Sequence, residues 1–236
     1  MAVKELLGQL HEVAECPRKQ LERYLGEGRR VIAMAPVYGP QEIVHSMGLV
    51  PMGVWGADVE INEAKKYYPA FICSVMQTIL ELGIKGEYKG VSAIIIPSLC
   101  DSLKTLGQNW KYAVADIPFI PMTYPQNRKQ DYGIKFTRAG YGRVISSLEV
   151  ATGARFSEPA LVKSNAIYNE HNRVMREFAE IASYADITAT QRSDVFKSAW
   201  FMTVEEHTAI VKELNEELKK GARAEGKLRV LVTGIL

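Results

Sequence analysis

The chain has 236 residues, of which 47% are hydrophobic and 24% charged, and its formal net charge is +2. A chain of this length can bury a substantial core, and its nearly balanced charge does not suggest binding to nucleic acid or an anionic membrane. No apolar run approaches the roughly 18–20 residues that cross a bilayer, and the N-terminal segment lacks the pattern of a signal peptide. We therefore expect a cytoplasmic protein.

The first half of the chain alternates helical patterns with short apolar runs. An amphipathic helix is predicted over residues 2–26, with a break at Cys16-Pro17. Strands are then predicted at 31–35, 50–55, 92–96 and 117–123, and helices at 41–47, 62–66, 70–82 and 101–114. Strands and helices that alternate in this way are typical of an α/β fold with an open, mainly parallel sheet flanked by helices.

The second half, from Gly133 onward, is almost wholly helical in its pattern. Helices are predicted over 135–152, 157–184, 193–201 and 204–221, the last one opened by a capping-box sequence from Thr203 to Glu206. Residues 227–236 resemble a basic lead-in, a buried strand and a glycine turn, which is how another strand–helix unit begins.

These patterns predict three parts. Residues 1–132 form a parallel α/β domain, and residues 133–226 form a helical segment that packs on it or links it to the next domain. Residues 227–236 form the first strand of a second α/β domain, at whose start we expect the sequence to be truncated.

The chain has three cysteines, Cys16, Cys73 and Cys100. Three is too few for a disulfide scaffold, and free thiols in a reducing compartment are either packing residues or metal and redox ligands. Cys16 lies inside the first predicted helix, where a packing or surface thiol is expected.

Cys73 and Cys100 have more informative positions. Cys100 follows the most apolar strand and precedes a helix that we expect Asp101-Ser102 to cap, and Cys73 lies in the predicted first turn of the helix after Pro69. Ligands of open parallel sheets bind at this edge, and a helix N-terminus favours the thiolate that binds iron. The two cysteines are one helix–strand unit apart, which by spacing alone is a weak metal signal, so packing roles stay open.

Two loops and the histidines complete the set of candidates. The loop at 36–42, which contains Tyr38, Gly39 and Glu42, can present backbone N–H groups to an oxyanion or a thioester carbonyl, although any strand-to-helix turn needs such residues. The basic loop at 126–129 is either a phosphate contact or solvated surface. We expect structural roles for the four histidines, none of which has a ligand-spaced partner: His11, His45, His171 and His207.

At these segments the sequence resembles the D-component family of 2-hydroxyglutaryl-CoA dehydratases, which includes 2-hydroxyacyl-CoA dehydratases. The likeness covers nearly the whole chain and is closest to β-type subunits such as that of the 2-hydroxyisocaproyl-CoA enzyme. It rests on residues 35–45 (APVYGPQEIVH), 49–56 (LVPMGVWG), 68–74 (YPAFICS), 99–103 (LCDSL), 106–110 (LGQNW), 168–172 (YNEHN) and 229–234 (RVLVTG).

The resemblance implies a heterodimer in which three cysteines of each subunit hold a 4Fe–4S cluster, and a separate ATP-hydrolysing iron–sulfur activator protein that supplies one electron. It implies that water is eliminated from (R)-2-hydroxyacyl-CoA through a ketyl radical to give enoyl-CoA. By the same resemblance, Cys73 and Cys100 are two of the three ligands, and the third belongs to the missing C-terminal domain. Tyr38, Gly39 and Glu42 would lie beside the cluster, without an assigned role.

Two other functions are compatible with the same residues. The chain could be a subunit of a benzoyl-CoA reductase-type enzyme, which shares the architecture and the activator but reduces its substrate. It could also be a non-catalytic subunit that relays electrons or supports its partner. The sequence does not specify the acyl group of the substrate.

Overall fold

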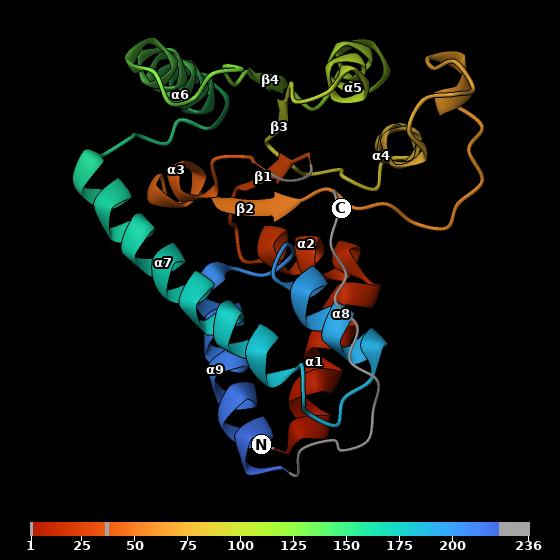
Figure 1. The fold of residues 1–236 in the computed structure, drawn as a ribbon. Helices are drawn as coiled ribbons and strands as arrows, with labels where there is room; N and C mark the ends of the chain where they lie inside the picture. The colour runs from red at the N-terminus through yellow and green to blue at the C-terminus, as the bar shows by residue number, and fades with distance from the viewer. Residues whose placement is uncertain (1, 36–37, 222–236) are drawn as a thin grey trace.

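The computed structural model describes residues 2–35 and 38–221 of the chain. Its strands are β1 (Val31–Met34), β2 (Val50–Gly53), β3 (Ala93–Pro97) and β4 (Phe119–Met122), which form an all-parallel sheet in the order β2-β1-β3-β4 (Figure 1). In its register, Ala33 of β1 lies opposite Met52 on one side and Ile94 on the other. The four predicted strands and the parallel sheet are confirmed.

Helices cover both faces of this sheet (Figure 1). One face carries α2 (Pro17–Gly26), α4 (Ser74–Ile84) and α5 (Asp101–Ala113), and the other carries α3 (Gln41–Ser46) and α6 (Asp131–Thr152). Each face of the sheet has its own apolar core, and successive residues of a strand point into opposite cores. Ile94 packs on the α4–α5 side and Ile95 on the α6 side. Burial on both faces explains why the strands are continuously apolar instead of alternating.

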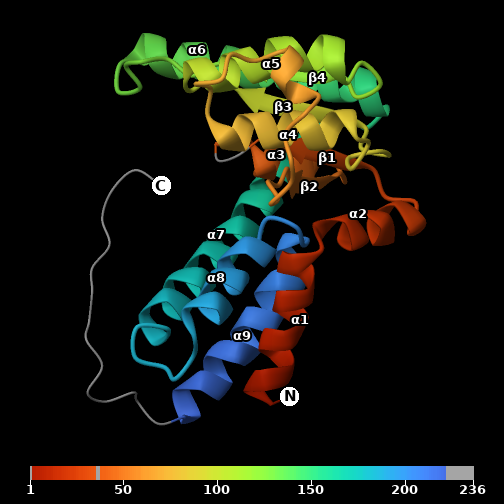
Figure 2. The same ribbon diagram turned by 90° about the vertical axis from the view of Figure 1, so that its right-hand side faces the viewer.

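The remaining long helices form a bundle beside the sheet layer (Figure 2). It consists of α1 (Val3–Glu15), α7 (Glu158–Ile181), α8 (Ala189–Ser198) and α9 (Val204–Lys220), which share a third apolar core. The N-terminal helix therefore packs among C-terminal helices, while α6 packs on the sheet. The predicted strand at 227–236 lies outside the described residues.

A polar joint connects the bundle to the sheet layer. The Tyr24 hydroxyl of α2 donates to Glu206 Oε2 of α9 at 2.8 Å, and Arg23 reaches both oxygens of the same carboxylate. The Thr203 hydroxyl accepts from Glu206 N at 3.4 Å, but Thr203 N–H donates to the Tyr24 hydroxyl, so the predicted capping box is only half formed. A complete capping box instead joins Thr188 and Gln191.

The helix boundaries differ from the prediction at several places. The capping box at Thr188 starts α8 at Ala189, ahead of the predicted start at 193. The predicted short helix at 62–66 is a single 3-10 turn, η1 (Ala64–Lys66). Among the described helices, none combines the length and apolarity that a membrane span requires.

Candidate functional site

Cys73 and Cys100 lie at the N-termini of two helices on the same face of the sheet. Cys73 is the N-cap of α4 and Cys100 the N-cap of α5, and both thiols are free and exposed. Because α4 and α5 each lead into a parallel strand, both helices begin at the carboxyl edge of the sheet. The predicted common edge of the two cysteines is therefore observed.

The local roles of these residues differ from the prediction. Residues 70–73 are not helical and α4 begins at Ser74, so Cys73 precedes the first turn. The Cys100 sulfur accepts the Leu103 N–H at 3.4 Å, so the cysteine caps α5, whereas Asp101 is its first residue and points into solvent. Cys16 is half-buried at the junction of α1 and α2, away from the strand-to-helix loops.

The two thiols supply part of a metal-binding set. Within the described ranges, no group of three or more His, Cys, Asp or Glu side chains is placed to hold a metal ion. Exposed cysteine side chains at neighbouring helix N-termini fit the sulfur ligands that an iron–sulfur cluster uses. They provide two such ligands, so further ligands must come from outside this pair.

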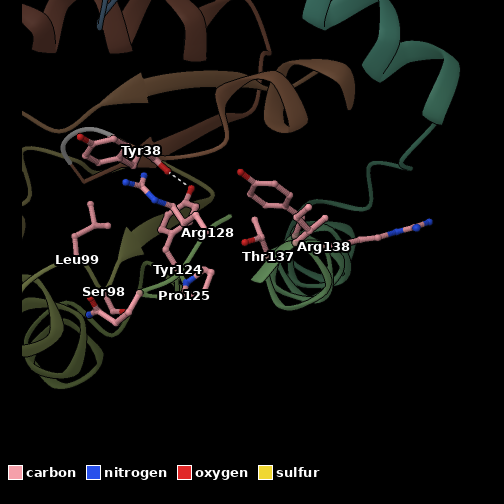
Figure 3. Close-up of a pocket in the computed structure, with 11 residues that line it drawn as sticks. Tyr38, Ser98, Leu99, Tyr124, Pro125, Arg128, Thr137 and Arg138 are labelled. Atoms are coloured by element: carbon pink, nitrogen blue, oxygen red, sulfur yellow. Dashed lines mark hydrogen bonds between the residues drawn. The ribbon is translucent and has the colours of Figure 1, made fainter. Parts of the chain in front are cut away.

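A cleft of about 670 Å³ opens at the same edge (Figure 3). It lies where β1 and β3 are neighbours but lead into helices on opposite faces, and such a switch point is where open α/β sheets bind ligands. Leu99, the residue before Cys100, lines it. The other lining residues follow β1, β3 and β4 or belong to α6: Tyr38, Ser98, Tyr124, Pro125, Gln126, Arg128, Ile134, Thr137, Arg138 and Tyr141.

Of the three weaker candidates, only Tyr38 lines this cleft. Its backbone is left-handed, with φ of 65°, and the Tyr124 hydroxyl donates to its carbonyl oxygen (Figure 3). Such a conformation is rare for a residue other than glycine and must be held by its surroundings. Gly39 packs against Met34, where a Cβ atom would collide with the methionine methyl group. Glu42 lies in the first turn of α3, outside the cleft lining.

Sequence reasoning missed several cleft residues, among them Tyr124, Thr137 and Tyr141. Tyr124 follows the carboxyl end of β4 as Leu99 and Cys100 follow that of β3, so its place in the fold was a usable signal. Burial raises the pKa of the Tyr124 hydroxyl, which favours its neutral, hydrogen-bonding form. Thr137 and Tyr141 carry no comparable signal, because their position depends on how α6 packs.

His45 lies between a serine and a carboxylate, but this set is structural. His45 Nδ1 lies 2.9 Å from Ser164 Oγ, and its Nε2 lies 2.8 Å from Glu205 Oε1. The order of these three side chains resembles the nucleophile, base and acid of a catalytic triad. However, Ser164 is 2% exposed and its hydroxyl donates to the Glu42 carbonyl, so substrate cannot reach it. These contacts join α3 to the bundle.

Two histidines, His171 and His207, lie in contact inside the bundle. His207 Nε2 lies 3.0 Å from the Val195 carbonyl, which can only accept, so the proton belongs on Nε2 and Nδ1 is an acceptor. His171 Nε2–H then donates to that Nδ1 at 3.0 Å. Protonation of His207 would place two N–H groups against each other. Burial, reinforced by His171, lowers the pKa of His207 to about 4.

This pair predicts a loss of stability in mild acid. Because the folded pKa of His207 is about 4 and the unfolded value is 6.5, stability is fully present above pH 6.5 and falls as the pH drops towards 4. The expected loss between pH 7 and pH 5 is about 2 kcal/mol in the free energy of unfolding, measured by urea titration. His207→Gln should lower stability at pH 7 and flatten this pH dependence. A pH dependence unchanged in that variant would contradict the assignment.

Comparisons with known proteins agree on one family. The family described as "2-hydroxyglutaryl-CoA dehydratase, D-component" matches residues 36–236. The chain is 42% identical to the (R)-phenyllactyl-CoA dehydratase beta subunit of Clostridium sporogenes, over 95% of this chain and 61% of that protein. It is 44% identical to the beta subunit of the lactoyl-CoA dehydratase of Anaerotignum propionicum, over 99% of this chain and 63% of that protein.

A more distant relative is named for a different activity. A benzoyl-CoA reductase subunit of Thauera aromatica is 28% identical over 87% of this chain and 55% of that protein. The chain thus spans about three fifths of the length of the two dehydratase relatives and slightly more than half of the reductase relative.

Proposed function

This chain belongs to the 2-hydroxyglutaryl-CoA dehydratase D-component family, and from that premise we propose that it is a subunit of an iron–sulfur 2-hydroxyacyl-CoA dehydratase. The proposed reaction is elimination of water from (R)-2-hydroxyacyl-CoA to give enoyl-CoA through a ketyl radical, after ATP-dependent one-electron activation. The observation that carries the proposal is the pair of exposed cysteines, both helix N-caps, of which Cys100 directly follows a residue that lines the cleft at the sheet edge.

The described residues have defined tasks in this proposal. Cys73 and Cys100 would hold a 4Fe–4S cluster as thiolates, and the Leu103 N–H, which already donates to the Cys100 sulfur, fixes that ligand. When bound, the cluster supplies an iron Lewis acid and one-electron redox chemistry. Tyr38 and Tyr124 form a polar wall of the cleft next to Leu99, on the side where a thioester would approach Cys100.

The proposal includes three partners. A second, homologous dehydratase subunit and an ATP-hydrolysing iron–sulfur activator protein would act with this chain, and an acyl-CoA would be the substrate. Large apolar side chains next to the two cysteines support a protein partner, because Phe71 is 88% exposed and Val75 and Leu99 are each more than 40% exposed. We propose a cytoplasmic location and neither a nucleic-acid nor a membrane partner.

Reductive chemistry on an aryl-CoA is the second candidate, because a benzoyl-CoA reductase subunit is among the relatives. The higher identity to the two dehydratase subunits favours elimination. The non-catalytic alternative, in which this subunit only relays electrons or supports its partner, would leave the substrate to the other subunit.

Product analysis tests the proposal. The chain, its partner subunit, the activator and ATP are incubated anaerobically with either a 2-hydroxyacyl-CoA or benzoyl-CoA. We expect enoyl-CoA from the first substrate and no reduced product from the second. A reduced ring product without enoyl-CoA would assign the chain to the reductase group. Unchanged turnover after cluster loss in a Cys73→Ala variant would assign it a supporting role.

A further inference from the structure

A groove of about 750 Å³ runs along α8, on the helical bundle. Its lining consists of residues between 182 and 200, in the loop after α7, on one side of α8 and just beyond the end of that helix. The α8 helix lies at the outside of the bundle (Figure 2). This α8 groove shares no lining residue with the cleft at the sheet edge, and the proposed function does not use it.

The α8 helix turns a largely polar side toward the core and an aromatic side toward the groove. Two of its three buried side chains are polar, Asp194 and Ser198, and His11 Nδ1 lies 2.8 Å from Asp194 Oδ2. On the opposite side lie Phe196 and Trp200, one turn apart and each more than a third exposed. A surface helix ordinarily buries its apolar side, so packing of the core does not account for this arrangement.

Both aromatic side chains are held in place by the protein itself. The Phe196 ring makes an edge-to-face contact with Phe178 of the bundle core, with 5.6 Å between the ring centroids. The Trp200 carbonyl accepts the Gly53 N–H at 2.7 Å, and a Cβ atom at Gly53 would lie 3.1 Å from the Trp200 Cβ. The α8 groove therefore offers two rings that need little ordering when a ligand binds.

Two cations accompany the rings. Arg192 and Lys197 are exposed and line the α8 groove, whose described lining contains no carboxylate. Neither cation makes an ion pair within the described part of the chain. Asp194, the acidic residue of α8, does not neutralise them from within the groove, because its side chain is buried on the core side. The two cations are thus available for an anionic ligand.

We propose that the α8 groove binds a small molecule that joins an aromatic ring to an anionic group, either a carboxylate or a phosphate. The ring would pack on Phe196 and Trp200, and the anion would contact Arg192 or Lys197. The volume falls in the range of small-molecule sites. A stable protein interface takes about 20–30 residues of each partner, more than the lining between residues 182 and 200 supplies. The proposal does not depend on the proposed function.

A titration of the 236-residue chain with 3-phenylpropionate and with phenyl phosphate tests the assignment. Binding is followed by calorimetry and by tryptophan fluorescence. The wild-type chain should bind one equivalent of the tighter probe with a Kd of about 1 mM or lower, as expected for a ligand of roughly eleven non-hydrogen atoms. The tighter of the two probes identifies the anionic group. The neutral counterpart 3-phenylpropionamide should bind about 10-fold more weakly or not at all.

Variants checked by circular dichroism locate the bound probe. The double variant Arg192→Gln/Lys197→Gln changes only exposed side chains and should weaken binding of the anionic probe about 10-fold or more. Arg176→Gln is the matched control, because Arg176 is an exposed cation of α7 outside the groove lining, and its affinity should stay within about twofold of wild type. Trp200→Phe keeps an aromatic wall, so it should retain calorimetric binding while it loses the fluorescence change.

Three results would overturn the proposal. The first is no binding of either anionic probe by the wild-type chain, and the second is equal affinity for the neutral amide. The third is wild-type affinity in the double variant, or a fluorescence change that persists in Trp200→Phe, since either would place the probe outside the α8 groove. The titration needs neither a cluster nor turnover, so its failure is distinct from failure of the product analysis.

Discussion

Replacing either Cys73 or Cys100 with alanine is expected to remove nearly all the iron that the chain retains after anaerobic reconstitution. The reconstitution contains iron, sulfide and an excess of a small thiol, which can occupy ligand positions that the chain's own cysteines leave open. Each thiolate is a direct ligand in the proposed site, and a cluster left with a single protein thiolate should be lost on desalting. Iron and sulfide per chain, with the thiolate-to-iron charge-transfer absorbance, measure the result.

Cys16→Ala is the control for this experiment. It removes the one other thiol of the chain, which is half-buried between α1 and α2 and lies outside the loops at the carboxyl edge. Its iron content should equal that of the wild-type chain. If Cys73→Ala and Cys100→Ala also keep the wild-type content, the iron is bound elsewhere. If the wild-type chain retains none, these two thiols do not form the proposed site.

The common edge of these cysteines could be predicted because it depends on local order alone. Cys100 directly follows the most apolar strand, and a strand–helix–strand repeat places each such turn at one end of a parallel sheet. The start of α4 could not be predicted in the same way. Residues 70–73 have an apolar, helix-like pattern, yet Phe71 is 88% exposed, so these side chains do not mark a face packed on the core.

The packing of the helices was less accessible to sequence reasoning. The apolar stripe of α1 has the same sequence pattern whether the helix packs on a sheet or on other helices. Its packing partners, α7, α8 and α9, are known only from the tertiary structure. The walls of the cleft depend on that kind of packing too. Arg128 reaches the cleft because Gly133 lets the loop fold onto α6, a contact that no pattern in the loop itself indicates.

Glu81→Leu is expected to cost about 3 kcal/mol in the free energy of unfolding, because it leaves buried backbone donors without an acceptor. The Glu81 side chain is fully buried on α4, and its Oε2 accepts the N–H of Ala64 at 2.8 Å and that of Asn62 at 3.2 Å. Lys85 Nζ lies 2.9 Å from Oε1. Burial acts to raise the pKa of Glu81, but these partners outweigh it and hold that pKa below its ordinary value.

The carboxylate therefore fixes the segment between β2 and α4, which leads directly to Cys73. Urea unfolding of three variants separates its contacts. Glu81→Gln keeps an oxygen for the two N–H groups and should lose less than Glu81→Leu, whereas Lys85→Met removes only the partly exposed partner and should lose about 1 kcal/mol or less. If Glu81→Leu is as stable as Lys85→Met, the backbone contacts contribute little. The segment would then have to be held by its apolar contacts, among them those of Ala64, which is fully buried in the α4–α5 core.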